Sequence, residues 1–189
     1  NLIYAYDEAG SQGATTVVAA DYVKWADVEA VRQQLGDRIV AATGVMTNYD
    51  RIVIDGREQD VRVNGSDEQY RAVRNLVILA GRSLDSSDVA LRQKVALLTE
   101  ALAKRLYGSQ EAALGQAVKI HGLQFTVIGT FKEKVQSFGL SELTSNTILI
   151  PVTVLKYFTP AERIDPMYVE ARRAQEVEGV TSEVRRILE

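Results

Sequence analysis

The amino-acid sequence predicts an α+β fold with mixed β-sheets. Short runs of aliphatic residues, which are typical of buried strands, alternate along the chain with segments whose apolar residues recur at helical spacing. Two other segments have the pattern of a β-hairpin, so a helix does not separate every pair of consecutive strands. The chain has 189 residues, of which 46% are hydrophobic, and this suffices for a core in one domain or two small ones.

The beginning of the chain predicts a strand followed by a helix. Residues 1–14 contain the sequence Gly-Ser-Gln-Gly and no sustained period, and we expect them to form a loosely held lead-in. Residues 16–20 have the composition of a short buried strand. From Val28 to Leu35 the apolar residues recur at helical spacing, and Gly36 is a natural helix terminator.

A β-hairpin is predicted next, from Arg51–Ile54 and a second strand that ends at Val61–Val63. The two strands flank Asp55 and Gly56, and an Asp-Gly pair suits the positive φ angles of a two-residue hairpin turn. Further along, Leu76–Leu79 is a run of aliphatic residues and predicts another strand.

The middle of the chain predicts a strand, a helix and a second hairpin. Residues 94–98 have the composition of a buried strand, Thr99 is a suitable cap for a following helix, and Gly108 is a suitable end for it. Residues 118–120 and 124–128 then predict two strands joined by a His-Gly turn.

The last part of the chain predicts two strands and a final helix. Residues 147–150 and 167–171 are rich in aliphatic residues, as buried strands are. Between Val177 and Ile187 the apolar residues fall on one helical face.

Composition and charge exclude several classes of function. The formal net charge is −3 and no basic run occurs, which argues against nucleic acid as a partner. The absence of cysteine excludes disulfides, thiolate metal sites and thiol nucleophiles. The chain has no stretch of about 20 apolar residues that could span a membrane. It begins at Asn1 without an initiator methionine or signal-peptide pattern, so we expect a piece of a longer protein.

Few residues suggest chemistry, and we predict no catalytic, cofactor or metal site. His121 is the only histidine, and its place at a hairpin tip favours a solvated turn residue over a general base. Asp85 and Asp88 do not have the spacing of a calcium-binding loop, and helix capping explains them better.

One aperiodic segment, Glu133–Asn146, is longer than an ordinary loop and carries three large apolar residues. We expect Phe138, Leu140 and Leu143 either to be tucked partly into the core or to contact a substrate or partner. These three residues are the candidate contact site of the sequence.

Several phrases in a fixed order resemble one known family. They are Val63-Asn64-Gly65-Ser66, Gly81-Arg82-Ser83-Leu84 with Asp88, Leu106-Tyr107-Gly108 with Gly115, Phe125-Thr126-Val127-Ile128-Gly129, and Ile148-Leu149-Ile150-Pro151. In this order, they resemble the extracytoplasmic core domain of MacB-type ABC transporter permeases, a group that includes FtsX-like and lipoprotein-releasing permeases. The shared glycines fall at turns and helix ends, so the likeness concerns backbone geometry rather than reactive groups.

The resemblance implies two subdomains. A porter-like βαβ subdomain would comprise residues 15–83 and 163–189, and an inserted α/β subdomain would comprise residues 84–162. Residues 1–14 would be the lead-in from a preceding transmembrane helix.

The resemblance also implies a non-enzymatic function without cofactors. The domain would lie on the periplasmic side of a bacterial inner membrane, as part of an integral membrane protein, and would couple cytoplasmic ATP hydrolysis to the handling of a substrate or partner. Its partners would be its own transmembrane helices, an ATP-binding domain absent from this chain, and a periplasmic adaptor or exported cargo. The full-length protein would be a homodimer, and we expect the isolated domain to be a monomer.

Two other classes of function stay open at this point. An extracytoplasmic ligand-binding module would need convergent polar groups around a concavity, and no part of the sequence gathers them. A metal-free hydrolase would need an acid/base pair in a cleft, and the acidic residues are scattered. We rank the transporter domain first, the ligand-binding module second and the hydrolase third.

Overall fold

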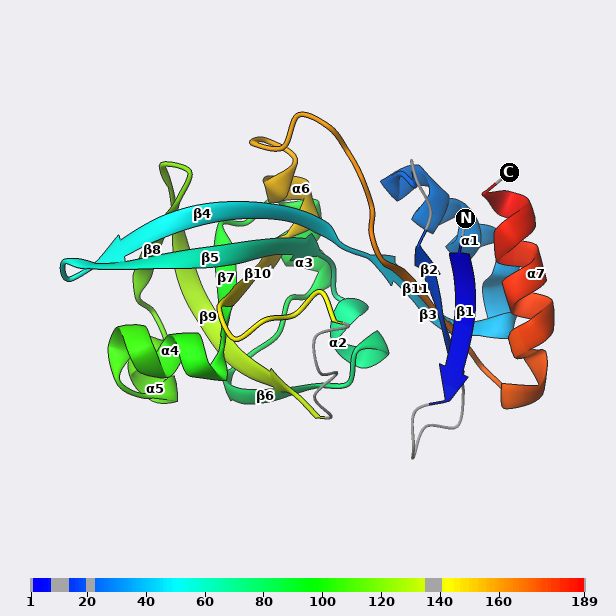
Figure 1. Cartoon of the computed structure of the whole chain (residues 1–189), viewed down its shortest axis with the longest axis horizontal. Helices are drawn as coiled ribbons and strands as arrows, with labels where there is room; N and C mark the ends of the chain where they lie inside the picture. Colours follow the sequence, from blue (N-terminus) through cyan, green and yellow to red (C-terminus); the bar gives the residue numbers. More distant parts are fainter. Residues whose placement is uncertain (1, 8–13, 20–22, 135–140, 189) are drawn as a thin grey trace. The chain divides into compact units, whose positions relative to one another are not determined.

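The computed structural model describes residues 2–7, 14–19, 23–134 and 141–188. The chain forms two compact units (Figure 1). The first unit comprises Asn1–Val45 and Ala161–Glu189, and the second comprises Met46–Pro160.

The first unit contains a four-stranded antiparallel sheet in the order β1-β2-β11-β3. Its strands are β1 (Leu2–Asp7), β2 (Ala14–Ala19), β11 (Met167–Ala171) and β3 (Ile39–Gly44). Strand β11 lies between two strands from the other end of the chain, so this sheet forms only when both ends of the sequence come together.

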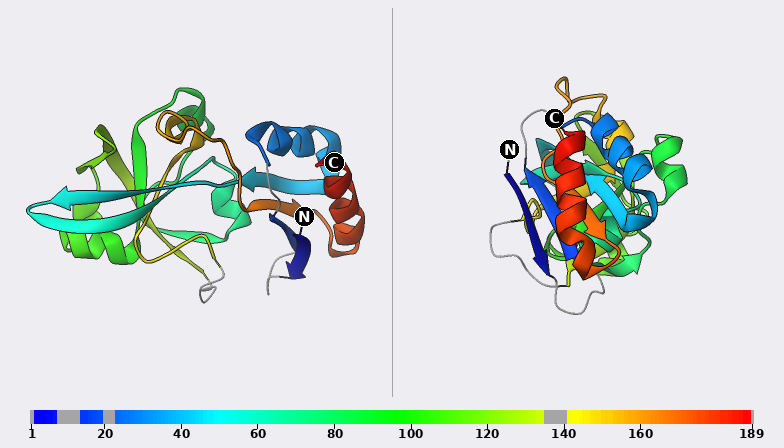
Figure 2. Two further views of the ribbon diagram at one scale, coloured as in Figure 1. Left: turned by 45° about the horizontal axis from the view of Figure 1, so that its top comes forward. Right: turned by 90° about the vertical axis from the view of Figure 1, so that its right-hand side faces the viewer.

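Two helices cover one face of this sheet, and both lie in front of the strands in the right-hand view of Figure 2. They are α1 (Trp25–Leu35) and α7 (Val177–Ile187), with short 3-10 turns at Gly36–Arg38 and Ala174–Glu176. Helix α1 buries the side chains at its helical repeat, which are Trp25, Val28, Val31 and Leu35. Helix α7 buries Val180 and Val184, and the apolar residues at its two ends, Val177 and Ile187, are half-buried.

The second unit contains a seven-stranded mixed sheet, which confirms the predicted α+β class. Its path is β4-β5-β10-β7-β9-β6, and β8 also pairs with β9. The strands are β4 (Met46–Ile54), β5 (Arg57–Ser66), β6 (Leu76–Gly81), β7 (Val95–Thr99), β8 (Ala117–Ile120), β9 (Leu123–Glu133) and β10 (Thr147–Pro151). The pairs β5–β10 and β7–β9 are parallel, and the others are antiparallel.

Both predicted hairpins are present in the second unit. Asp55 and Gly56 have φ angles of 50° and 77°, and His121 and Gly122 have φ angles of 48° and 80°. Positive φ at both central positions is the turn geometry that matches the twist of paired strands. The two turns therefore have the backbone conformation that the sequence predicts.

Five short helices belong to the second unit: α2 (Tyr70–Val73), α3 (Ser86–Ala90), α4 (Glu100–Tyr107), α5 (Gln110–Ala113) and α6 (Val152–Leu155). Helices α4 and α5 contact strands β6, β7 and β9, whereas α6 contacts β4, β5 and β10. Helix α4 starts directly after Thr99 and ends at Gly108, whose φ of 89° is the left-handed conformation of a helix terminator.

The first boundary between the units differs from the prediction. The contacts divide the chain after Val45, not after residue 83, so residues 46–83 belong to the second unit. The reason is a long-range strand pair, because β5 of the first hairpin pairs in parallel with β10. The second boundary, after Pro160, lies close to the predicted one at residue 162.

The beginning of the chain also differs from the prediction. Within the expected lead-in, Leu2–Asp7 forms strand β1, which pairs with β2 along its whole length. The glycine-rich sequence that suggested an irregular lead-in lies outside the described residues. A strand at a sheet edge can form from a short apolar run when a partner strand follows, and the local pattern alone does not reveal that partner.

Two glycines allow a close backbone crossing in the second unit. A Cβ atom at Gly81 would lie 2.1 Å from the carbonyl oxygen of Ile128, and one at Gly129 would lie 2.2 Å from the carbonyl oxygen of Arg82. At this crossing the amide of Arg82 donates a hydrogen bond of 3.0 Å to the Ile128 oxygen. The crossing therefore requires glycine at both positions.

Replacing Gly129 with alanine should destabilise the protein, because the new methyl group would collide with backbone atoms that cannot rotate away. We expect the free energy of unfolding to fall by about 1–3 kcal/mol in denaturant titrations. Gly179→Ala in α7 is the matched control, since its nearest neighbour is the end of the flexible Arg38 side chain. Equal melting temperatures for the two variants would contradict the proposed crossing.

Candidate functional site

The three predicted contact residues have different outcomes. Phe138 and Leu140 lie outside the described residues. Leu143 is buried, with 9% of its surface exposed, and so does not offer its side chain to a partner. Its burial follows from the hydrogen bonds that hold the segment 141–147 against the second unit.

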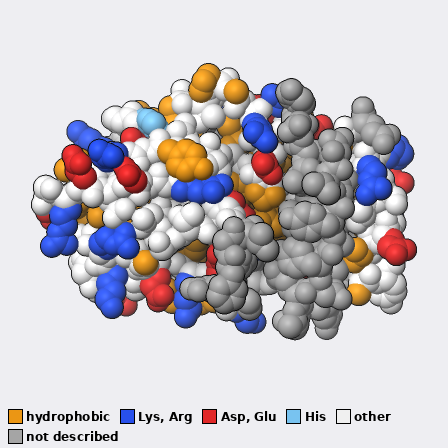
Figure 3. Space-filling view, in the orientation of Figure 1, with side chains coloured by type: hydrophobic (Ala, Val, Ile, Leu, Met, Phe, Trp, Pro, Cys, Tyr) orange, Lys and Arg blue, Asp and Glu red, His pale blue; other side chains and the backbone are white. Residues whose placement is uncertain are grey.

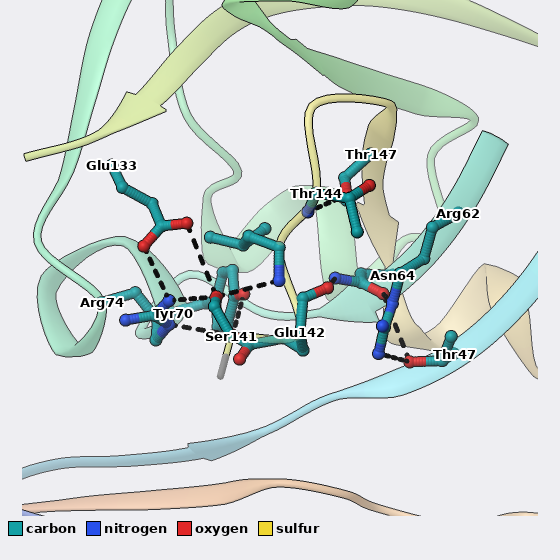
Figure 4. A network of polar contacts seen from close by, with 11 residues as sticks. Thr47, Arg62, Asn64, Tyr70, Arg74, Glu133, Ser141, Glu142, Thr144 and Thr147 are labelled. Atoms are coloured by element: carbon teal, nitrogen blue, oxygen red, sulfur yellow. Dashed lines mark hydrogen bonds and ion pairs between the residues drawn. The ribbon is translucent and has the colours of Figure 1, made fainter. Parts of the chain in front are cut away.

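The centre of these interactions is a buried ion pair (Figure 4). Arg74, which follows α2, donates from Nε to Glu142 Oε1 at 2.9 Å, and the two side chains are only 4% and 3% exposed. The hydroxyl of Tyr70 donates to the same carboxylate oxygen. Tyr70 is itself fully buried, so the first residue of α2 and the residue that follows the helix both reach Glu142 from the interior.

A second carboxylate shares the same guanidinium group. Arg74 Nη2 lies 3.2 Å from Glu133 Oε2, at the end of β9, and 2.7 Å from Ser141 Oγ. Ser141 Oγ in turn accepts a hydrogen bond of 2.9 Å from the backbone amide of Leu143. Arg74 therefore ties the end of β9 to the segment that begins at Ser141.

A second set of contacts comes from the hairpin strands. Asn64 of β5 donates from Nδ2 to the carbonyl oxygen of Glu142 at 3.1 Å. Its Oδ1 atom accepts from Arg62 Nε at 3.1 Å and from the hydroxyl of Thr47 at 3.2 Å. The carboxamide of Asn64 is thus fixed in one orientation, which aims its amide at the backbone of residue 142.

The end of the segment is fastened as well. Thr99 Oγ1 donates to the carbonyl oxygen of Ser145 at 2.6 Å. The amide of Thr144 donates to Thr147 Oγ1 at 2.8 Å. We call the residues of these contacts the anchor network: Thr47, Arg62, Asn64, Tyr70, Arg74, Thr99, Glu133, Ser141, Glu142, Thr144 and Thr147.

The contacts of the anchor network hold one segment of the backbone in place. Both carboxylates engage the same buried guanidinium, so neither has the independence of a general acid or base. Among the residues the structure describes, no three His, Asp or Glu side chains are placed to share a metal ion. The network fixes the position of 141–147 relative to α2, β5 and β7.

Sequence reasoning missed this network because its partners are remote in the chain. Arg74 and Glu142 are 68 residues apart, and Tyr70 and Glu142 are 72 apart. Charged residues are usually solvated, and nothing in the local pattern marks these as buried. The only indication of the network in the sequence was the lack of a helical or strand period in residues 133–146. Such a segment can be held in place by side-chain hydrogen bonds to other parts of the chain.

Arg74→Met should destabilise the protein strongly, because it leaves Glu142 and Glu133 without their buried cation. We expect the free energy of unfolding to fall by about 3–5 kcal/mol, measured by denaturant titration. The control is Arg51→Met, which removes an exposed cation that pairs with Asp60 at 2.8 Å and should cost about 0–1 kcal/mol. A similar small loss for both variants would show that Glu142 and Glu133 do not depend on Arg74 as their buried cation.

Asp85 and Asp88 cap helix α3, as predicted. Asp85 Oδ1 accepts from the amide of Asp88 at 2.8 Å, and Asp88 Oδ2 accepts from the amide of Asp85 at 2.9 Å. Arg82 also grips the nearly buried Asp88 carboxylate, with Nη1 at 2.7 Å and Nη2 at 3.1 Å. The hydrogen bond from Arg82 is the main cause of a lowered pKa for Asp88, and burial opposes it.

Because the pKa of Asp88 is lower in the folded state, its ionised form contributes stability above the unfolded pKa of about 3.9. This contribution is lost as the pH falls toward the folded value. We expect Asp88→Asn to lower the free energy of unfolding by about 1.5–3 kcal/mol at pH 7. The difference from the wild type should shrink between about pH 5 and pH 3.

The matched control is Asp60→Asn, which removes an exposed carboxylate and should change the free energy of unfolding little at about pH 7 or about pH 3. A difference between Asp88→Asn and the wild type that stays constant down to pH 3 would contradict the role of the ionised Asp88.

His121 has the surroundings of a turn residue. It is exposed, its backbone amide donates to Asp50 Oδ2 at 2.8 Å, and its ring lies 4.7 Å from that of Phe158. Nε2 is 3.2 Å from Asn48 Oδ1. These contacts join the second hairpin to β4 and to the residues after α6.

No helix within the described part of the chain is both long enough and apolar enough to cross a membrane. The chain matches the MacB-like periplasmic core domain family over residues 1–187.

Relatives and solved structures agree with this match. The macrolide export ATP-binding/permease protein MacB of Chlorobium luteolum is 27% identical over 147 residues, which are 77% of this chain and 22% of that protein. The chain therefore spans about a fifth of the length of this curated relative.

Two crystal structures share the fold. The periplasmic region of MacB from Actinobacillus actinomycetemcomitans has a TM-score of 0.77 at 20% identity, covering 95% of this chain and 85% of that one. The extracellular domain of the ABC-type transporter YknZ from Gram-positive bacteria has a TM-score of 0.72 at 19% identity, covering 88% and 82%. The resemblance predicted from the sequence is confirmed, and this chain belongs to the family of MacB-like periplasmic core domains of ABC transporter permeases.

Proposed function

We propose that this chain is the extracytoplasmic part of an ABC transporter permease that couples ATP hydrolysis in the cytoplasm to the handling of a substrate or partner outside the membrane. The observation that carries the proposal is the family match over residues 1–187, together with the fold shared with the periplasmic region of MacB. In this proposal the domain transmits conformational change and performs no catalytic step of its own.

The connectivity of the first unit supports a transmitting role. Strand β11 lies beside β2, so the two ends of the chain enter one hydrogen-bonded sheet. Where the chain leaves this sheet, the amide of Val45 donates to the carbonyl oxygen of Pro166 at 3.1 Å, and the amide of Asp165 donates to that of Val45 at 2.9 Å. A displacement applied at either end would therefore act on the same sheet and on both connections to the second unit.

The partners in this proposal lie partly outside the chain. They are the transmembrane helices of the same protein, an ATP-binding domain, and outside the membrane a periplasmic adaptor or an exported cargo. The domain would lie on the periplasmic side of a bacterial inner membrane. The full-length protein would be a homodimer, and the isolated domain would be a monomer. The transport itself would be efflux, or export of a lipoprotein or peptide.

The proposal predicts that the two units change their separation when the full-length protein binds and hydrolyses ATP. The chain has no cysteine, so spin labels can be placed at Glu29→Cys in α1 and Lys104→Cys in α4, both of which are exposed. We expect the distribution of distances between the two labels to differ between the ATP-bound and the ADP-bound protein. Pulsed electron paramagnetic resonance in proteoliposomes measures this distribution.

The control pair is Lys104→Cys with Lys119→Cys, two exposed positions within the second unit, whose separation should stay constant. An ATP-binding variant that cannot hydrolyse ATP should abolish cycling between the two distributions. Identical distributions for the first pair in ATP and ADP would overturn the coupling role.

A further inference from the structure

An exposed apolar and basic surface lies where helices α3 and α6 end. Leu91, just after α3, and Tyr157, just after α6, are large hydrophobic residues that are 68% and 65% exposed. Arg92 and Lys94 are exposed beside Leu91 in the chain, and Lys156 is exposed beside Tyr157. We call these five residues the α3–α6 surface.

Direct contacts join the two halves of this surface. The guanidinium carbon of Arg92 lies 5.9 Å from the centroid of the Tyr157 ring, and Nη1 lies 3.2 Å from the Tyr157 hydroxyl. Beneath them, Thr153 Oγ1 of α6 donates to the carbonyl oxygen of Val89 in α3 at 2.7 Å. Arg92 and Tyr157 therefore contact each other across the ends of α3 and α6, and Leu91, Lys94 and Lys156 lie within two residues of them in the chain.

The backbone that displays Tyr157 is held in place. Asn48 Nδ2 donates to the carbonyl oxygen of Phe158 at 3.3 Å and to Thr159 Oγ1 at 2.9 Å. The Phe158 ring contacts that of His121 in a tilted arrangement, and the amide of Tyr157 donates to the carbonyl oxygen of Val154 at 3.1 Å. An exposed aromatic residue on a fixed backbone loses little conformational freedom when a partner covers it.

The backbone at Arg92 is unusual as well. Its φ of +53° is the left-handed conformation, which glycine or asparagine adopts more readily than arginine. An arginine at this position is therefore not explained by backbone preference. The position is also suited to a test, because glycine can replace arginine there without steric cost.

The chain segments that carry this surface are basic, and the two aspartates at the start of α3, Asp85 and Asp88, pair with Arg82. The segments 89–99 and 143–161, which carry all five residues, contain no aspartate or glutamate, although the whole chain has a net charge of −3. Within the described residues no carboxylate forms a salt bridge with Arg92 or Lys94, whereas Arg51 on the first hairpin pairs with both Glu58 and Asp60. On the face drawn in Figure 3, acidic and basic side chains are mixed over that hairpin.

A purely structural role explains only part of this arrangement. Cations near a helix C-terminus interact favourably with its carbonyl groups, which would account for Arg92 and Lys156. It would not account for the exposure of Leu91 and Tyr157 next to them, since exposed aromatic and arginine side chains together are typical of binding surfaces.

We propose that the α3–α6 surface binds an acidic segment of a polypeptide that also carries apolar side chains. Its carboxylates would pair with Arg92 and Lys94, and its apolar side chains would cover Leu91 and Tyr157. The complementary charge commits the partner to an acidic one, and the two apolar side chains are too few to anchor the domain on a lipid surface. This inference rests on the proposed function, because it names the chemistry of the partner handled outside the membrane.

The test uses the chain itself and a fluorescent peptide of alternating glutamate and leucine pairs, with binding followed by fluorescence anisotropy. We expect saturable binding that weakens as salt is raised from about 50 to about 300 mM, because the pairing charges are exposed. A peptide in which lysine replaces glutamate should bind at least about tenfold more weakly.

Arg92→Gly combined with Tyr157→Ser should weaken binding of the acidic peptide by at least about tenfold. Thermal melting of this variant should stay close to that of the wild type, because relief of the left-handed backbone at residue 92 offsets the extra freedom that glycine gives the unfolded chain, and this separates lost binding from lost structure. Lys104→Gln and Lys119→Gln are the matched controls, since each removes one positive charge from an exposed position of the same unit and should leave binding nearly unchanged.

Three outcomes would overturn the proposal: no binding of the acidic peptide, equal binding by the double variant, or equal loss in the lysine controls. Binding to vesicles that contain phosphatidylglycerol, if it is stronger than peptide binding and lost in the double variant, would assign the surface to a membrane instead. A negative result in the peptide-binding test would not affect the prediction that the spin-label distance in the full-length protein differs between ATP and ADP. The two proposals can therefore be tested separately.

Discussion

Each unit of this protein depends on a strand pair between segments that are far apart in the sequence. In the first unit β11 inserts between β2 and β3, and in the second β10 inserts between β5 and β7. Neither sheet is continuous without its inserted strand, because β10 and β11 are each bonded on both edges. Pairing of remote strands has to overcome the entropy of closing a long loop before its hydrogen bonds form. The stability of the fold therefore depends on its two sheets, and the short helices pack against strands that are already paired.

The anchor network extends this dependence to the segment that leads into β10. Glu142 and Ser141 are fixed by Tyr70 and Arg74 on one side, and the backbone of residue 142 is fixed by Asn64 on another. A buried ion pair is costly to desolvate and gives a fold little net stability, but it is intolerant of a missing partner. Such an arrangement specifies one position for a segment that has no helical or strand period. The start of β10 is thereby set in register with β5, where Thr147 lies opposite Arg62.

The anchor network and the two sheets fix the positions of the described segments in this member of the MacB-like periplasmic core domain family. The buried polar groups of the anchor network hold the segment 141–147 against α2 and β5, and the solitary histidine joins a hairpin to its neighbours. On the exterior, Arg92 and Tyr157 contact each other at the ends of α3 and α6.

The sequence by itself determined the local structure of this protein. The Asp-Gly and His-Gly turns, the helix from Thr99 to Gly108 and the capping pair Asp85 and Asp88 all follow from backbone preferences over a few residues, and the ordered glycine-containing phrases identified the family. Tertiary structure alone decided the boundary after Val45, the strand at Leu2–Asp7, and the burial of Arg74, Glu142 and Leu143. The physical reason is that these features depend on partners many tens of residues away. A local pattern records the preference of a segment, whereas burial and strand pairing depend on what the rest of the chain places against it.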